Sequence, residues 1–330
     1  MNKSELLKSF YSAAGLLCEP LWTAMGGLND EVRMTCEEIR LRVDRPMELI
    51  CWGKSVIPDR CRIVRPGDLE DTLRRCTGNS VHTYLPQLCK GFATARGGHR
   101  FGICGEAIRT GGAVTGFRNI TSLNIRIARQ LVGIADPLTA RLLERPKKSL
   151  LVVSGPGVGK TTLLRDLARG LSLHLHVAIA DSRYELAGVS EGRPCFRIGN
   201  CDVMSGVEPG DALEMLIRTM SPEYLVMDEI TGRRELDALQ SAAFAGVSML
   251  ASCHAACPEE LRQREIYRPL LTGGLFQMLV FIVQREGRRC YLLYEEVPDA
   301  ADGCVPADAC CLYGHIFRKT ADICPESVVG

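Results

Sequence analysis

The residues with the clearest chemical potential are Lys160 and Thr161, in the stretch Val152–Thr162, which reads VVSGPGVGKTT. An apolar run precedes this stretch and leucines at helical spacing follow it, so the pattern predicts a strand, a glycine-rich loop and a helix. Backbone N–H groups of such a loop and helix start bind anions. We therefore predict that Lys160 reaches the β- and γ-phosphates of a nucleotide and that the Thr161 hydroxyl ligates Mg²⁺. The alternative is a chance glycine turn before a helix.

The predicted phosphate-binding loop departs from its consensus at one position. G-x-x-x-x-G-K-[ST] begins with glycine, whereas this chain has Ser154 there. A serine fits the start of the turn if its φ is negative. Lys160 is expected on a solvated part of the loop, so that its replacement would abolish nucleotide binding and leave the fold intact. The residues predicted to contact nucleotide are Gly155, Pro156, Gly157, Val158, Gly159, Lys160, Thr161 and Thr162.

Two further apolar runs end in acidic residues. Tyr224–Met227 reads YLVM and is followed by Asp228 and Glu229. After a GKTT loop in an alternating α/β pattern, this arrangement predicts that Asp228 holds Mg²⁺ through water and that Glu229 polarises the attacking water.

The run Leu173–Ala180 ends in the sequence DSRYE, which contains Asp181 and Glu185. Because the carboxyl ends of parallel strands border the ligand crevice, either acid would orient water or Mg²⁺. A surface turn is the alternative. His254 follows a predicted strand over Val247–Ser252 and would sense the γ-phosphate, with an ordinary loop histidine as the alternative.

Composition sets limits on the class of protein. The 330 residues suffice for one large or two ordinary domains, and 40 Lys and Arg balance 39 Asp and Glu, so no global charge indicates nucleic acid or a membrane as a partner. The 16 cysteines include no CxxC pair, which favours reduced thiols in a cytosolic protein. Glu5 and Lys8 interrupt the N-terminus, so no signal peptide is predicted.

The N-terminal third predicts a mixed domain. Helical spacing covers residues 1–33, and Ile39, Leu41 and Val43 alternate with arginines as in a half-buried strand. A helix is expected over Leu69–Cys76, with Asp68 as its cap.

The segment Lys90–Gln130 predicts a small β-rich part with a basic face, since it holds seven basic residues against the single acid Glu106. The face is either an ordinary solvated surface or a phosphate contact, to nucleic acid or to a nucleotide on a neighbouring subunit. The basic residues are Lys90, Arg96, Arg100, Arg109, Arg118, Arg126 and Arg129.

The fold class expected from these patterns is α/β, with a P-loop NTPase core and a smaller α+β N-terminal domain. We place the N-terminal domain at residues 1–135, the P-loop domain at 136–299 and a loosely ordered tail at 300–330. Cys290–Glu295 is expected to form an edge strand.

The order of these motifs resembles the secretion-type ATPases of type II and type IV systems. The N-terminal segments narrow the resemblance to the stage III sporulation AA family of endospore-forming bacteria. The resemblance covers about Glu37 to Leu261. The sequences that carry it are SGPGVGKTTLLRDLAR, AIADSRYELAG, EMLIRTMSPEYLVMDEITGRRELDAL, MLASCHAACPEEL, EEIRLRVDRP, KGFATARGGHRFGICGEAI and NIRIAR.

The resemblance implies a RecA-like ATPase that assembles into a ring, a hexamer, with ATP between subunits. It places the protein in the mother-cell cytoplasm, at the membrane through partner proteins of a sporulation channel. It assigns Lys160 and Thr161 to the phosphate loop, Asp228 and Glu229 to the Walker B strand, and Glu185 and His254 to the acidic and histidine boxes. Arg126 and Arg129 fall where the superfamily has arginines that reach a nucleotide. Ser154 and Ser182 depart from the family pattern.

These observations lead to three hypotheses. The first is hydrolysis of Mg-ATP, with Glu229, Glu185 and His254 as catalytic residues, coupled to a channel or secretion complex between mother cell and forespore. The second is a nucleotide-gated scaffold with little turnover. The third, a nucleic-acid motor that uses the basic face, is the least favoured, and no nucleic-acid partner is expected.

Overall fold

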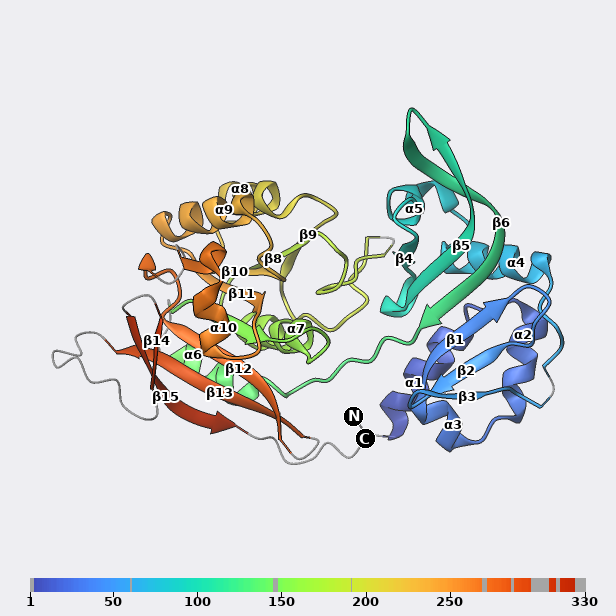
Figure 1. Ribbon diagram of the computed structural model, residues 1–330, viewed down its shortest axis with the longest axis horizontal. Helices are drawn as coiled ribbons and strands as arrows, with labels where there is room; N and C mark the ends of the chain where they lie inside the picture. The colour runs from blue at the N-terminus through green and yellow to red at the C-terminus, as the bar shows by residue number, and fades with distance from the viewer. Residues whose placement is uncertain are drawn as a thin grey trace. The chain divides into compact units, whose positions relative to one another are not determined.

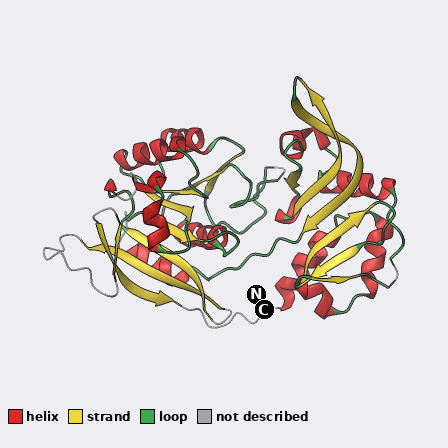
Figure 2. Ribbon diagram, viewed as in Figure 1, coloured by secondary structure: helices red, strands yellow, loops and turns green. Residues whose placement is uncertain are grey.

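The computed structural model describes residues 3–59, 61–144, 148–190, 192–268, 272–285, 288–297, 309–312 and 315–323. The chain divides into two compact units, an N-terminal unit of Met1–Gln130 with Gly188–Phe196 and a C-terminal unit of Leu131–Ala187 with Arg197–Gly330. Both units contain helices and strands (Figures 1 and 2). The N-terminal unit ends at Gln130 instead of the expected residue 135, and it also contains Gly188–Phe196, which the sequence patterns do not predict.

The N-terminal unit is an antiparallel sheet with helices. The strands are ordered β3-β2-β1-β6-β5-β4. Its helices are α1 (Lys3–Ala14), α2 (Glu19–Ala24), α3 (Asp30–Thr35), α4 (Pro66–Cys76) and α5 (Val81–Leu88), with short 3-10 helices η1 (Met25–Gly27) and η2 (Arg96–Gly98). Its strands are β1 (Cys36–Arg42), β2 (Glu48–Cys51), β3 (Lys54–Val56), β4 (Phe92–Thr94), β5 (Arg100–Thr110) and β6 (Ala113–Arg126).

The expected alternation holds in β1, where Ile39 and Leu41 are buried in the core of the unit and Arg40 and Arg42 are not. The cap of α4 differs from the expectation. Arg65 is the N-cap residue, and Asp68 lies three positions inside the helix, where its carboxylate accepts the Arg65 backbone N–H at 2.8 Å. Pro66 explains the shift, because proline is favoured in the first turn and lets the helix begin earlier.

The segment Gly188–Phe196 contacts residues of the N-terminal unit that are far from it in the sequence. The Ser190 hydroxyl lies 2.8 Å from the Tyr84 hydroxyl. The Phe196 ring packs on Gly98, where a Cβ would lie 2.7 Å from Phe196 Cζ and where φ is +78°. Glycine is therefore required at position 98 for both conformation and space.

The C-terminal unit is built on a nine-stranded sheet of order β14-β15-β13-β12-β7-β11-β10-β8-β9. Its helices are α6 (Asp136–Glu144), α7 (Lys160–Leu171), α8 (Pro209–Met220), α9 (Arg233–Phe244), α10 (Pro258–Gln263) and the 3-10 helix η3 (Glu265–Tyr267). Its strands are β7 (Leu150–Ser154), β8 (Val177–Asp181), β9 (Asp202–Ser205), β10 (Tyr224–Met227), β11 (Ser248–His254), β12 (Met278–Arg285), β13 (Arg288–Val297), β14 (Ala309–Leu312) and β15 (His315–Ile323).

Strands β9, β8, β10, β11, β7 and β12 pair in parallel. Helices α8 and α9 lie together, and α6 and α7 form a second pair (Figure 1). Strands β7, β8 and β10 are buried throughout, which explains why they read as continuous apolar runs instead of alternating. The parallel arrangement brings the carboxyl ends of β7, β8, β10 and β11 to one edge of the sheet, where the predicted site residues lie.

Strands β14 and β15 contradict the expectation of a loosely ordered tail over residues 309–312 and 315–323, and the rest of the predicted tail lies outside the described residues. Strand β15 pairs with β13, and β14 pairs with β15, so β13 is an internal strand and not the expected edge. The register of β13 and β15 shifts between Leu293 and Tyr294. Such a bulge changes the phase of the side-chain alternation along a strand, so β15 was not recognised from a period of two. Cys290 on β13 is disulfide-bonded, contrary to the expectation of reduced thiols, whereas eleven cysteines in the described ranges are free as expected.

Candidate nucleotide-binding site

The phosphate-binding loop connects β7 to α7 and has the backbone geometry that a P-loop requires. Gly157 has φ +72° and Gly159 has φ +120°, conformations that strongly favour glycine. Ser154 has no positive φ, and its hydroxyl donates to the Gly155 carbonyl at 3.0 Å. The serine at the first consensus position is therefore compatible with the turn.

Lys160, the first residue of α7, is buried, contrary to the expectation of a solvated side chain. It is 6% exposed, and its Nζ donates to the carbonyls of Ser154 at 3.2 Å and Gly155 at 3.1 Å. A third hydrogen bond of 2.8 Å joins Nζ to His254 Nδ1. Burial lowers the pKa of Lys160, while the carboxylates of Asp228 and Glu229 oppose this shift. The ammonium group is thus held in the loop, where phosphate would replace the carbonyl partners.

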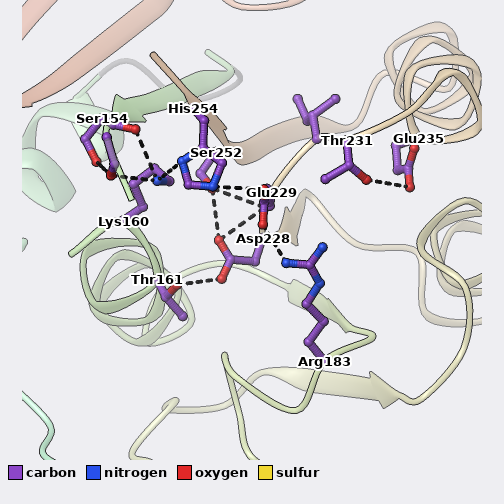
Figure 3. Close-up of polar contacts among 12 residues, drawn as sticks. Ser154, Lys160, Thr161, Arg183, Asp228, Glu229, Thr231, Glu235, Ser252 and His254 are labelled. Carbon is purple, nitrogen blue, oxygen red and sulfur yellow. Dashed lines mark hydrogen bonds and ion pairs between the residues drawn. The ribbon is translucent and has the colours of Figure 1, made fainter. Parts of the chain in front are cut away.

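The Walker B strand β10 brings Asp228 to the start of α7 (Figure 3). The Thr161 hydroxyl donates to Asp228 Oδ2 at 2.6 Å. Ser252 on β11 donates to Asp228 Oδ1 at 2.9 Å and accepts the Glu229 backbone N–H at 3.1 Å. Sequence reasoning missed Ser252, although a serine inside the apolar run Met249–Cys253 is a signal that a buried polar partner exists.

The donor set fits Mg²⁺. No cluster of three or more His, Cys, Asp or Glu side chains suited to a metal occurs in the described ranges. Mg²⁺ in nucleotide sites, however, takes one or two protein oxygens and completes its shell with water and phosphate. The Thr161 hydroxyl and the Asp228 carboxylate are hard oxygen ligands that already lie together, so these two residues would hold the ion.

Glu229 is held between two other side chains. His254 Nε2 lies 2.8 Å from Glu229 Oε1, and Arg183 Nη1 lies 2.5 Å from Glu229 Oε2. His254, the last residue of β11, contacts Glu229 through Nε2 and Lys160 through Nδ1. Its ring therefore bridges these two side chains. The sequence motifs alone do not predict a function for Arg183.

The acidic segment at the end of β8 contains a buried carboxylate, Asp181, and a half-buried one, Glu185. The buried Asp181 carboxylate accepts the backbone N–H groups of Glu185, Leu186 and Ala187 at 2.8, 3.1 and 2.9 Å. Arg165 on α7 donates to the carbonyls of Glu185 and Leu186, and burial lowers its pKa to about 10. Asp181 therefore shapes the turn, whereas Glu185 lines the cavity beside the loop.

A cavity of about 360 Å³ brings most of the predicted residues together. Its lining residues are Pro156, Gly157, Gly159, Lys160, Thr161, Thr162, Glu185, Asp228, Glu229 and His254. Gly155 and Val158 belong to the same loop. A further residue that sequence reasoning missed is Arg289 on β13, whose Nη1 would lie 3.4 Å from a Cβ built on Gly159.

Arg126 and Arg129 are not among the lining residues of this cavity, and each contacts residues of the N-terminal unit. Arg126 pairs with Glu38 at 3.0 Å. Arg129 donates to the carbonyls of Met34 and Cys36 at 2.6 and 2.7 Å, and burial lowers its pKa. Their assignment to a nucleotide remains a prediction.

The fold and this site define an α/β protein of the P-loop NTPase type. Two solved ATPase structures share the fold at 15% sequence identity. The ATPase DotB of Legionella pneumophila has a TM-score of 0.53, with 91% of this chain and 82% of that chain covered. The pilus retraction motor PilT with bound ADP has a TM-score of 0.53 and 82% coverage of both chains.

The chain belongs to the family described as sporulation stage III, protein AA, whose model matches residues 28–297. The Stage III sporulation protein AA of Bacillus subtilis (strain 168) is 37% identical over 284 residues, which are 83% of this chain and 91% of the relative. The uncharacterized protein ycf45 of Cyanidium caldarium is 32% identical over 146 residues, 42% of either protein. The resemblance to the sporulation family is confirmed. In the described part of the chain, no helix combines the length and apolar character needed to cross a bilayer.

Proposed function

We propose that this protein is a Mg²⁺-dependent ATPase that drives a channel or secretion complex between mother cell and forespore. The observation that carries the proposal is the 2.6 Å hydrogen bond from the Thr161 hydroxyl to Asp228 Oδ2. This contact lies next to Glu229 and directly after the phosphate-binding loop. Phosphoryl transfer to water needs a phosphate cradle, a metal-binding pair and a water-orienting carboxylate, and the residues for all three lie on one edge of the sheet.

Each side chain has a distinct task in the proposed reaction. Lys160 would exchange its carbonyl partners for the β- and γ-phosphates. Thr161 and Asp228 would hold Mg²⁺, whose charge would offset that of the phosphate oxygens. Glu229 orients the attacking water, and His254 senses the γ-phosphate from the end of β11. Glu185, which also lines the cavity, assists in ordering water.

The biological setting of the proposal comes from the family and the fold. The Bacillus subtilis relative is named as a sporulation protein, and the solved neighbours are named as ATPases or motors. A homo-oligomeric ring, hexameric in the proposed form, would place ATP between subunits and bring Arg126 or Arg129 to a neighbouring nucleotide. Membrane proteins of a sporulation channel would be its partners, and the mother-cell cytoplasm its location.

The test is ATP turnover by the purified chain over a concentration series, with mass measured in parallel. We expect turnover that requires Mg²⁺, rises steeply as the ring assembles, and is lost in Glu229→Gln. Glu214→Gln is the matched control, since Glu214 is 54% exposed on α8 in a surface pair with Arg218. Turnover that is equal in wild type and Glu229→Gln would contradict the proposal.

A nucleotide-gated scaffold is the second candidate, and one observation favours it. Both carboxylate oxygens of Glu229 already have a partner, Arg183 and His254, as expected if the site binds ATP and assembles without rapid hydrolysis. Nucleotide binding and ring assembly with negligible turnover in the wild type would select this function. The nucleic-acid motor is less favoured, because Arg118 and Arg126 of the basic face are paired with Glu106 and Glu38.

A further inference from the structure

Glu229 occupies a place where its carboxylate is restrained from two sides. His254 comes from the end of β11, and Arg183 comes from the turn after β8, so the two partners belong to different strands (Figure 3). A carboxylate accepts about four hydrogen bonds. Two partners therefore fix the direction of the group and leave lone pairs for a water molecule.

The charges of Lys160, His254 and Glu229 can be assigned from the hydrogen bonds among them. The Lys160 ammonium can only donate, so His254 Nδ1, at 2.8 Å from it, must accept. The remaining proton of a neutral imidazole then lies on Nε2 and is donated to Glu229 Oε1. Arg183 is consequently the one positively charged side chain among the two direct partners of Glu229.

The turn that carries Arg183 is a built structure. The Asp181 carboxylate binds three backbone N–H groups of the turn, and Arg165 binds two of its carbonyls. Tyr184, the neighbour of Arg183, has φ +58°, a conformation that persists in non-glycine residues when surrounding contacts enforce it. The backbone of Arg183 is thus fixed with respect to α7 and β8, although its side chain is 54% exposed.

We propose that Arg183 is a positioning residue, which holds the Glu229 carboxylate in the orientation that aligns the attacking water. This inference rests on the proposed ATPase function and adds a residue to it. Arg183 acts through Glu229 and not on the nucleotide, so its loss should affect the chemical step and leave substrate binding unchanged. The loss of a charge-assisted hydrogen bond predicts a decrease in kcat of about tenfold or more, with KM for ATP within about twofold of wild type.

The experiment compares wild type, Arg183→Gln, Arg183→Lys and the surface control Arg218→Gln in steady-state ATP hydrolysis. We expect Arg183→Lys to recover kcat to within about threefold of wild type, because the contact is made through a single nitrogen and lysine keeps the charge. Arg218→Gln should match wild type. A kcat that is unchanged or raised in Arg183→Gln, or a change confined to KM, would overturn the inference.

A double-mutant cycle separates this inference from the proposed function. Arg183→Gln should lower kcat in the wild-type background and have no further effect in Glu229→Gln. Wild type, Arg183→Gln, Glu229→Gln and the double variant are also unfolded in urea without nucleotide. Non-additive changes in the urea midpoint report the Arg183–Glu229 contact whether or not ATP is hydrolysed. Absence of wild-type turnover would refute the ATPase function alone, whereas additive midpoints would refute the role of Arg183.

Discussion

Replacement of Lys160 by methionine tests the site most directly, because it removes the charge and keeps most of the side-chain volume. The apo protein loses three hydrogen bonds, to Ser154, Gly155 and His254, each worth about 1 kcal/mol. It also loses a buried ammonium group, whose desolvation costs several kcal/mol. These effects oppose each other, so we expect the free energy of unfolding at pH 7 to change by only about 1 kcal/mol.

The sign of the pH dependence follows from the lowered pKa of Lys160. The ordinary value is 10.5, and burial lowers it in the folded protein. Between the native value and 10.5 the unfolded chain binds more protons than the folded chain, so wild-type stability rises with pH in that window. Lys160→Met lacks this contribution. The difference in stability between wild type and variant should therefore shift in favour of wild type as the pH rises toward 10.5.

The assay must observe the C-terminal unit. Both tryptophans, Trp22 and Trp52, lie in the N-terminal unit, so fluorescence does not report on Lys160. Urea unfolding monitored through the hydrogen exchange of backbone amides in β7 and α7 does report on Lys160. Nucleotide at 100 times its Kd should stabilise wild type by about 2.7 kcal/mol and leave Lys160→Met unaffected. An apo variant less stable by more than about 3 kcal/mol at pH 7, or one stabilised by nucleotide, would refute the reasoning.

Three further predictions concern single residues. Ser252→Ala should lower kcat and destabilise the C-terminal unit by about 1–2 kcal/mol, because Asp228 and the Glu229 N–H lose a buried partner; retained kcat with Mg²⁺ would contradict this. Gly159→Ala should weaken nucleotide affinity at least tenfold in a titration, since its φ is +120° and alanine there costs about 1–3 kcal/mol; unchanged affinity would contradict it. Burial lowers the pKa of His99 from 6.5 to about 4, so acidification through that window should destabilise the N-terminal unit by up to about 3 kcal/mol. Tryptophan fluorescence during urea unfolding measures this loss, and His99→Gln should reduce it.

The sequence was most informative where function depends on contiguous residues. The loop Gly155–Thr162 and the strand end at Asp228 are each encoded locally, by glycines, a lysine and an apolar run, and the parallel sheet then joins them at one edge. Strands β7, β8, β10 and β11 of the P-loop core were predicted from the same patterns, whereas β9 and β12 were not. His254 was proposed to sense the γ-phosphate because it follows a predicted buried strand.

The remaining features depend on contacts between distant segments. Ser252 and Arg183 contact Asp228 and Glu229 because β11 and the turn after β8 flank β10. No local sequence pattern predicts these contacts. The position of Gly188–Phe196 in the N-terminal unit depends on packing of Phe196 against Gly98. Lys160 was expected in solvent because the motif does not reveal that Ser154, Gly155 and His254 surround its ammonium group.

The backbone at Glu229 explains how two adjacent carboxylates serve different partners. Glu229 has φ +31°, an unfavourable conformation for a residue with a side chain. Its N–H is bound by Ser252 Oγ and by Asp228 Oδ1, both at 3.1 Å, and these bonds stabilise the turn. Asp228 contacts Thr161 on the metal-binding side, while Glu229 contacts His254 and Arg183. Because the turn separates the two carboxylates, a metal held by Asp228 would leave Glu229 available to orient water, as hydrolysis of the γ-phosphate requires.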